Sequence, residues 1–282
     1  MLKWQIGDTK ITQLLEISDG SGALDIIPAA KPDSLGTIPW LKPHFVSPEG
    51  NLILNIQMLI IETPSRKMVV DTCIGNDKNL NMEGWANLQL PFLENLKDMG
   101  HDPDSIDTVI CTHLHVDHVG WNTKKVGGKW VPTFPNARYL MVNEEYEFWR
   151  DLEEDPFGDV FGESVAPIFD AGLADLVNND HLVGDGVSFE STPGHTPGHI
   201  SVSISSGGEE AVITGDMMHH PCQIARPDWT TPFDADNDAA VETRKKFLEK
   251  YADKPVLVFG THFANPVAGN IIRDGDTYRF DT

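Results

Sequence analysis

Cysteine and basic residues are scarce in this chain of 282 residues. Its three cysteines, Cys73, Cys111 and Cys222, are widely spaced and form no CxxC pair. An odd number without pairing predicts free thiols in a reducing compartment rather than a disulfide framework. Lysine and arginine number 21 against 43 acidic residues, which gives a formal net charge of −22. Binding to nucleic acid or to anionic membranes needs clustered basic side chains, so neither is expected.

Long apolar runs are also missing. The longest, around 52–61, is interrupted by Asn55 and Gln57. It is far shorter than the ~20 residues that cross a bilayer. The first eight residues lack the apolar segment of a secretory signal. Hydrophobic residues nevertheless make up 40% of the chain, enough for a sizeable core. These features together predict a soluble cytoplasmic protein.

No internal repeat or linker divides the chain, which predicts one domain over residues 1–282. Proline and glycine gather from about 18 to 50 and predict an irregular arm. Such a segment is too long for an ordinary connection. We therefore expect it to cover the active site or to pack against a partner subunit.

Strands and helices are expected to alternate along the chain. The first strands turn at Gly7-Asp8, and Asn143 is expected to cap a helix. Further strands are expected at 52–62, 67–70, 107–111, 138–142, 189–192, 200–204, 211–214 and 256–259, and helices at 88–99, 144–150 and 238–251. This alternation favours a layered α/β fold.

Three histidines and an aspartate lie within six residues, directly after a predicted strand. They are His113, His115, Asp117 and His118. Imidazole and carboxylate groups are ligands for Zn²⁺ and similar divalent metals. In an extended segment His113 and His115 point to the same side, so one ion can bind both. Asp117 and His118 lie beyond the bend, where they can reach a second ion.

This motif resembles the signature of the metallo-β-lactamase fold superfamily. Four further segments follow that family's order: a strand ending in Asp71 and the segments 192–199, 214–216 and 260–262. The resemblance runs from about Leu52 to the C-terminus. It implies a four-layer αββα sandwich with the metal ions at one edge of the sheets.

Seven residues would then bind two Zn²⁺ ions, with other divalent metals as alternatives. One ion would be held by His113, His115 and His195. The other would be held by Asp117, His118 and His262. Asp216 would bridge them, and the nucleophile would be a hydroxide between the ions.

The resemblance also suggests roles for neighbouring residues. Asp71 is expected to orient a ligating histidine. His199 lies close to His195 and is expected outside the ligand set. Asp117 and His219 are the candidate catalytic residues. Asp117 would orient the hydroxide. His219 follows Asp216 by three residues, where members often carry an acid or a hydrogen-bond donor, and simple solvation of the loop is the alternative for it. Cys73 stands where many members have glycine.

Segments 134–137, 148–149, 233–236 and 273–280 resemble the branch that contains methyl parathion hydrolase and the N-acyl-homoserine lactonases. The predicted function is a dinuclear zinc hydrolase that opens a lactone or cleaves a carboxylic ester. An aryl phosphotriester hydrolase is the alternative, and an iron-dependent sulfur dioxygenase of the same fold is a further one. Relatives are often dimers, which predicts a homodimer with the arm at its interface.

Three tryptophans near the motif are expected to line an apolar pocket for a small neutral ester, lactone or phosphotriester. They are Trp85, Trp121 and Trp149. Core packing is the alternative for each of them. The acidic stretch 144–163 would discourage strongly anionic substrates, unless it is only a solvated surface.

Overall fold

The computed structural model describes residues 2–19 and 25–282, so part of the predicted arm, 20–24, lies outside the described residues. The chain divides into two compact units. Unit 1 comprises Met1–Glu16 and Ile56–Asn178, and unit 2 comprises Ile17–Asn55 and Asn179–Thr282. Each unit has its own sheet, and the single domain over 1–282 stays a prediction.

Unit 1 is built on a seven-stranded sheet in the order β1-β2-β3-β4-β5-β8-β9. The strands are β1 (Lys3–Ile6), β2 (Thr9–Asp19), β3 (Leu54–Glu62), β4 (Lys67–Val70), β5 (Thr108–Ile110), β8 (Arg138–Val142) and β9 (Ala174–Val177). Within this sheet the four neighbouring strands β4, β5, β8 and β9 pair in parallel. Consecutive residues of β3, β4 and β5 are buried, as expected for strands covered on both faces.

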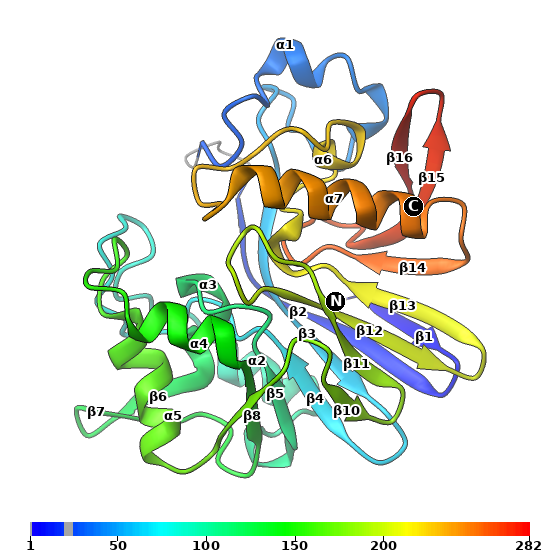
Figure 1. Cartoon of the computed structure of the whole chain (residues 1–282). Helices are drawn as coiled ribbons and strands as arrows, with labels where there is room; N and C mark the ends of the chain where they lie inside the picture. The colour runs from blue at the N-terminus through cyan, green and yellow to red at the C-terminus, as the bar shows by residue number, and fades with distance from the viewer. Residues whose placement is uncertain (1, 20–24) are drawn as a thin grey trace. The chain divides into compact units, whose positions relative to one another are not determined.

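Short helices and one hairpin complete unit 1. They are α2 (Phe92–Asp98), α3 (Val116–Val119), α4 (Asn143–Arg150), α5 (Ala166–Asp170), the 3₁₀ turns η2 (Pro103–Ser105) and η3 (Gly120–Asn122), the π-helical turn η4 (Phe161–Val165), and the hairpin β6 (Thr123–Val126) and β7 (Lys129–Pro132). α4 contacts β8 and β9 (Figure 1).

The predicted cap at Asn143 is wrong. Asn143 is the first residue of α4, and its side-chain amide donates to the Val177 carbonyl oxygen at 3.1 Å.

Unit 2 has a seven-stranded sheet in the order β10-β11-β12-β13-β14-β15-β16. The strands are β10 (Leu182–Gly184), β11 (Val187–Ser191), β12 (Ile200–Ser206), β13 (Glu209–Ile213), β14 (Val256–Phe259), β15 (Ala268–Asp274) and β16 (Thr277–Asp281). β13 and β14 pair in parallel, because α7 connects them as a crossover, and the other pairs are antiparallel.

The helices of unit 2 are α1 (Pro32–Leu35), η1 (Pro39–Leu41), η5 (Gly215–Met217), α6 (Cys222–Ala225) and α7 (Asn237–Tyr251). α7, orange in Figure 1, begins where the Asp236 side chain accepts the backbone N–H of Ala239 at 3.0 Å. Its buried residues recur at helical spacing: Ala240, Arg244, Phe247, Leu248 and Tyr251. This spacing gives α7 one inward face.

The described part of the Pro-rich arm belongs to the core of unit 2. Its apolar side chains, among them Ile27, Leu41 and Phe45, are buried in one cluster with Phe247 of α7 and Phe280 of β16. The described part of the arm thus packs against its own chain, and its expected contact with a partner subunit or with the active site stays a prediction. The homodimer itself stays a prediction.

The predicted α/β class is confirmed, and several bounds agree closely. The strands expected at 67–70, 138–142 and 256–259 have those bounds. The helix expected at 88–99 is shorter, Phe92–Asp98, because it begins after Pro91 and proline restricts the residue before it. In the described part of the chain, no helix is long and apolar enough to cross a membrane. The cytoplasmic location stays a prediction.

Candidate metal centre

Unit 1 carries four of the predicted ligands beyond the carboxyl ends of β4 and β5. β4 ends at Val70, and the next residue is the buried Asp71. β5 ends at Ile110 and leads through Thr112 into the histidine-rich loop. Because β4 and β5 are parallel neighbours, Asp71 and the loop meet at one edge of the sheet.

Asp71 orients the histidine loop with both carboxylate oxygens. Its Oδ1 accepts the backbone N–H of Thr112 at 2.8 Å, and its Oδ2 accepts the Thr112 hydroxyl at 2.8 Å. Nδ1 of His118 lies 2.9 Å from the same Oδ2. An ionised carboxylate only accepts, so Nδ1 carries the proton and Nε2 keeps its lone pair for a metal ion. The expected orienting contact of Asp71 is therefore present.

His113 and His115 lie on the same side of the loop. Nε2 of His113 is 2.9 Å from Nδ1 of His115, so the two nitrogens share either a proton or a metal ion. Nδ1 of His113 is 3.1 Å from the Thr112 hydroxyl, which already donates its only proton to Asp71. The hydroxyl must accept from His113, which leaves the lone pair on Nε2.

The second pair of predicted ligands in unit 1 adjoins the first. The ring centroids of His113 and His118 are 4.0 Å apart. Oδ1 of Asp117 lies 3.7 Å from Nε2 of His118. Asp117 and His118 are on α3, which begins immediately after His115. The loop and the first turn of α3 thus bring all four side chains together.

A strained backbone segment follows Asp71. The backbone dihedral φ is 54° at Asp71 and 55° at Cys73. Both residues thus have a left-handed conformation that residues with an L side chain rarely adopt. Such a φ suits glycine, which fits the glycine that the family resemblance led us to expect at the position of Cys73. The half-buried side chain of Glu16 holds the segment by accepting the N–H groups of Ile74 at 2.8 Å and Gly75 at 3.1 Å. Burial raises the pKa of Glu16 to about 7.

Unit 2 gathers the other predicted ligands around Asp216. This residue lies in η5, just after β13, and its carboxylate is buried. Nε2 of His195 is 3.6 Å from its Oδ2, and Nε2 of His262 is 3.2 Å from its Oδ1. Nε2 of His219 is 3.2 Å from Oδ2. His195, Asp216 and His219 lie close enough together to hold one metal ion.

The hydrogen-bond partner of Nδ1 shows which imidazole rings keep a lone pair on Nε2 that a metal ion could bind. Nδ1 of His195 is 2.9 Å from Oδ1 of Asp234, and Nδ1 of His262 is 2.7 Å from the Asn55 carbonyl oxygen. A carboxylate and a carbonyl only accept, so both Nδ1 atoms are protonated and both Nε2 lone pairs face Asp216. Lone pairs that face a carboxylate at this distance need a cation between them, a proton or a metal ion. The residues present therefore fit Zn²⁺.

His219 differs from these two histidines. Its side chain is 2% exposed, and its Nδ1 has no hydrogen-bond partner among the described residues. Its ring is parallel to that of His262, with centroids 6.0 Å apart. Because no acceptor holds a proton on Nδ1, the tautomer with the proton on Nε2, toward Asp216, is favoured. This arrangement suits a hydrogen-bond donor better than a ligand.

The two neighbouring histidines are engaged on both ring nitrogens. Nδ1 of His199 donates to the Thr192 carbonyl at 3.0 Å, and Nε2 accepts the Asp216 N–H at 2.8 Å. His220 donates from Nε2 to the Phe45 carbonyl at 2.8 Å and accepts the Cys222 N–H at 3.0 Å. Burial lowers the pKa of His220 to about 4. Neither histidine has a lone pair left for a metal ion, as expected for His199.

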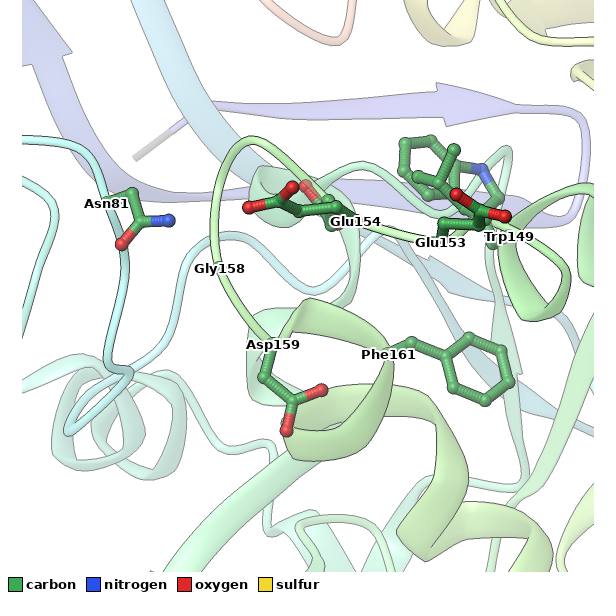
Figure 2. A pocket seen from close by; sticks show the side chains of 9 residues that line it. Asn81, Trp149, Glu153, Glu154, Gly158, Asp159 and Phe161 are labelled. Atoms are coloured by element: carbon green, nitrogen blue, oxygen red, sulfur yellow. The ribbon is translucent and has the colours of Figure 1, made fainter.

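A pocket of about 330 Å³ lies wholly in unit 1 beside the histidine loop. Trp149, at the end of α4, and Phe161 give it aromatic surface (Figure 2). The ring centroid of Trp149 is 5.1 Å from that of His115. The rest of the lining is Asn81, Leu152, Glu153, Glu154, Asp155, Gly158 and Asp159. Trp149 therefore lines a pocket beside His115, and its contact with substrate stays a prediction.

The other two tryptophans do not line this pocket. Trp121 is 4% exposed and stacks on Phe92, with ring centroids 5.5 Å apart. Its indole N–H donates to the Glu16 carboxylate at 2.7 Å. Trp85 is half-buried in a turn that follows Met82. Trp121 therefore packs in the core of unit 1. Trp85 lines none of this pocket.

Several supporting residues were not foreseen from the sequence. Glu145 accepts the N–H of Leu114 at 3.0 Å and the indole N–H of Trp149 at 2.6 Å, and so ties α4 to the histidine loop. Asp234 and the Asn55 carbonyl orient His195 and His262, two of the predicted ligands. Glu16, Asn55 and Glu145 belong to no recognisable motif. Asp234 lies within 233–236, which was noted only for its resemblance.

Comparison with known proteins agrees with this geometry. The model of the metallo-beta-lactamase superfamily matches residues 54–262. An N-acyl homoserine lactonase from Bacillus sp is 27% identical over 231 residues, covering 76% of this chain and 84% of that protein. One from Bacillus cereus is 26% identical over 226 residues, covering 75% and 83%.

Solved structures show the same fold. A hydrolase of the beta lactamase superfamily, AbOPH, is similar with a TM-score of 0.79 and 26% identity, covering 99% of this chain and 96% of that one. AidC, a dizinc quorum-quenching lactonase in complex with a product, has a TM-score of 0.79, 23% identity and the same coverage. The predicted fold is thereby confirmed. From its ligand geometry, its fold and a family match over well more than half of its length, this chain belongs to the metallo-beta-lactamase superfamily.

Proposed function

We propose that this chain is a dinuclear zinc hydrolase that opens a lactone or cleaves a carboxylic ester. The proposed ligands are His113, His115, Asp117, His118, His195, Asp216 and His262. One observation carries the proposal: His118, His195 and His262 each have Nδ1 fixed by an acceptor, which leaves Nε2 for a metal ion. A histidine cluster that served only packing or solubility would not need this shared arrangement.

The relatives support the choice of reaction. Relatives that match about three quarters of this chain include N-acyl homoserine lactonases. The dizinc lactonase AidC, with a bound product, shares the fold. A lactone is therefore the first substrate class to test, and zinc is the first metal.

The bound ions would lower the pKa of water and polarise the scissile carbonyl oxygen. The protein then has to place a water oxygen against the carbonyl carbon and to protonate the leaving oxygen. We assign the first task to Asp117, which orients the attacking water as well as binding metal. We assign the second to His219, whose favoured tautomer carries a proton on Nε2. The carbon–oxygen bond of the lactone breaks, and the leaving oxygen becomes a hydroxyl group.

The pocket supports a neutral substrate with an apolar part. Trp149 and Phe161 offer aromatic surface to an acyl chain, and Trp149 also contacts His115. Glu153, Glu154 and Asp159 surround them with negative charge. An uncharged lactone or ester fits this environment better than an anionic one.

The test combines metal analysis with a substrate panel. Purified protein is stripped with a chelator, reloaded with zinc and assayed on an N-acyl homoserine lactone, an aryl ester and an aryl phosphotriester. We expect about two zinc ions per chain and the highest kcat/KM on the lactone. His195→Ala should lose metal and activity together, whereas the exposed His44→Ala should lose neither.

Each alternative has its own outcome. Higher activity on the phosphotriester than on the lactone would establish the aryl phosphotriesterase instead. One redox-active iron per chain, with no activity on any of the three substrates, would favour a sulfur dioxygenase. Metal-independent hydrolysis would contradict the dinuclear proposal.

A further inference from the structure

A fully buried arginine lies on the inner face of α7. Arg244 is 0% exposed, at a helix position where the spacing calls for an apolar side chain. Removing a guanidinium group from water is costly unless its N–H groups are paired. Burial lowers the pKa of Arg244, and the nearby Asp234 carboxylate opposes this effect. A buried charge at this position needs an explanation beyond packing.

The guanidinium group binds the backbone next to the predicted ligands. Its Nε donates to the Met217 carbonyl at 2.9 Å, and Met217 directly follows Asp216. Its Nη1 donates to the carbonyls of Pro227 at 2.7 Å and Trp229 at 2.8 Å. Arg244 therefore holds η5 and the segment that leads toward Asp234.

Its third nitrogen faces the carboxylate that orients His195. Nη2 lies 3.7 Å from Oδ2 of Asp234, and both side chains are 0% exposed. Oδ1 of the same carboxylate lies 2.9 Å from Nδ1 of His195. The guanidinium group of Arg244 thus lies against one oxygen of the Asp234 carboxylate while the other oxygen holds Nδ1 of His195, so Arg244 limits where this carboxylate can lie.

We propose that Arg244 is a positioning residue for the metal centre, which acts on His195 through Asp234 and on Asp216 through the Met217 carbonyl. The inference rests on the proposed function, because it takes His195 and Asp216 as ligands. The proposal adds that the affinity of His195 and Asp216 for zinc depends on Arg244, a residue outside the ligand set. Sequence motifs did not mark Arg244.

The experiment is a double-mutant cycle on the whole chain, with Arg244→Met, Asp234→Asn and the double variant. Zinc affinity is measured by competition with a chelator. Each single variant should weaken binding ~10–100-fold, the usual effect of removing a group that orients a ligand. The double variant should bind about as weakly as the weaker single variant, because both changes break one linkage. Additive losses would overturn the route through Asp234.

A second measurement does not require metal. In the metal-free protein, ¹⁵N shifts of His195 report which ring nitrogen carries the proton. Both single variants should reduce the form protonated on Nδ1. Arg226→Met is the matched control, since Arg226 donates to the Ala225 carbonyl and not to Asp234, and it should change neither readout. Lower stability in urea with unchanged zinc affinity and unchanged His195 shifts would mean that Arg244 is only structural.

Arg244→Lys covers the case in which the methionine variant does not fold. It keeps the charge but cannot pair with three carbonyls, so its zinc affinity should lie between those of the wild type and Asp234→Asn. Wild-type affinity in both Arg244→Lys and Asp234→Asn would overturn the proposal. A wild-type protein that binds zinc but opens no lactone would contradict the proposed function alone.

Discussion

The role of each histidine in this chain depends on the atom that its second ring nitrogen meets. His118, His195 and His262 have an acceptor on Nδ1 and present Nε2. His199 is bonded on both nitrogens, so it has no free lone pair. A neutral imidazole has one N–H donor and one nitrogen with a lone pair. Its neighbours therefore decide whether it binds a metal ion, donates a proton or only packs.

His219→Gln tests the proton donor. We expect kcat on a lactone to fall ~10²–10⁴-fold, the usual contribution of a general acid. An activated aryl ester should lose much less, because its leaving group departs without a proton. Zinc content, measured by elemental analysis, should stay at the wild-type value. A loss of zinc as large as that in His195→Ala would make His219 a ligand.

Glu16→Gln tests the half-buried carboxylate that holds the strained segment from Asp71 to Cys73. The pKa of Glu16 is about 7 in the folded protein and 4.5 when exposed. Between these values the unfolded state releases the proton and the folded state keeps it, so stability falls as pH rises from 4.5 to 7. This difference corresponds to about 3 kcal/mol of stability that is absent above pH 7. Urea unfolding of the metal-free variant should show a flatter pH dependence over this range.

The exposed Glu94→Gln is the control for that experiment. Its pH dependence should match that of the wild type. An unchanged slope in Glu16→Gln would show that Glu16 is ionised throughout the range.

At the scale of elements, the connections at the ends of strands and helices position the proposed ligands. Gly194 precedes His195 in the β11–β12 connection and has a φ of 131°. A Cβ there would lie 2.3 Å from the backbone nitrogen of Ala240, so only glycine lets α7 approach this loop so closely. The position of His195 therefore depends on how α7 packs as well as on its own loop.

Trp149→Ala tests the end of α4 as a pocket wall. The change removes apolar contact that is worth ~10–200-fold in discrimination between long and short acyl chains. We expect the ratio of kcat/KM for a long-chain lactone to that for a short-chain one to fall by this factor. Activity on a small activated ester should largely survive. Trp149→Phe keeps an aromatic wall and should retain most of the preference, whereas an unchanged ratio in Trp149→Ala would place this residue in the core.

Phe45→Ala tests the arm as part of the core of unit 2. The Phe45 side chain is 1% exposed and packs against Phe280, with ring centroids 6.1 Å apart. Its loss should lower the free energy of unfolding by ~3–5 kcal/mol. The exposed neighbour provides the control His44→Ala, which should change stability little. Dissociation of a dimer without loss of stability, seen by light scattering, would instead place the arm at an interface.

At the scale of the whole molecule, acidic charge exceeds basic charge by 22, and the pocket in unit 1 shares this bias. A negative potential around a site repels anionic ligands and is screened by salt. The bias is therefore expected to act on substrate selection as well as on solubility.

The charge effect can be measured with two lactones that differ only at the end of the acyl chain, one ending in a methyl group and the other in a carboxylate. We expect the neutral lactone to have a kcat/KM several-fold higher at low salt, with the ratio shrinking as salt rises. Replacing Glu153 and Glu154 by Gln should reduce the preference. The exposed pair Glu209 and Glu210 of β13, replaced in the same way, should leave it unchanged. Equal rates for both lactones at low salt would mean that the acidic rim is only a solvated surface.

The sequence alone determined the features that depend on local order. The spacing of His113, His115, Asp117 and His118 pointed to metal binding, because side chains this close in a chain are close in space. Strands such as β4, β8 and β14 could be located because short apolar runs between turn residues leave few other structures. The family, and with it the fold, followed from the order of such motifs along the chain.

Tertiary structure decided what depends on contacts between distant residues. Trp121 and Trp149 look equally suitable in the sequence, yet one stacks on Phe92 and the other lines a pocket. The arm had no regular pattern, because its side chains are buried individually against α7 and β16 rather than along a periodic face. Arg244 faces Asp234 only because α7 turns it inward, and no local pattern marks a polar residue on a buried face. Whether a side chain is ligand, support or core depends on its neighbours in space, and folding brings those neighbours from distant parts of the chain.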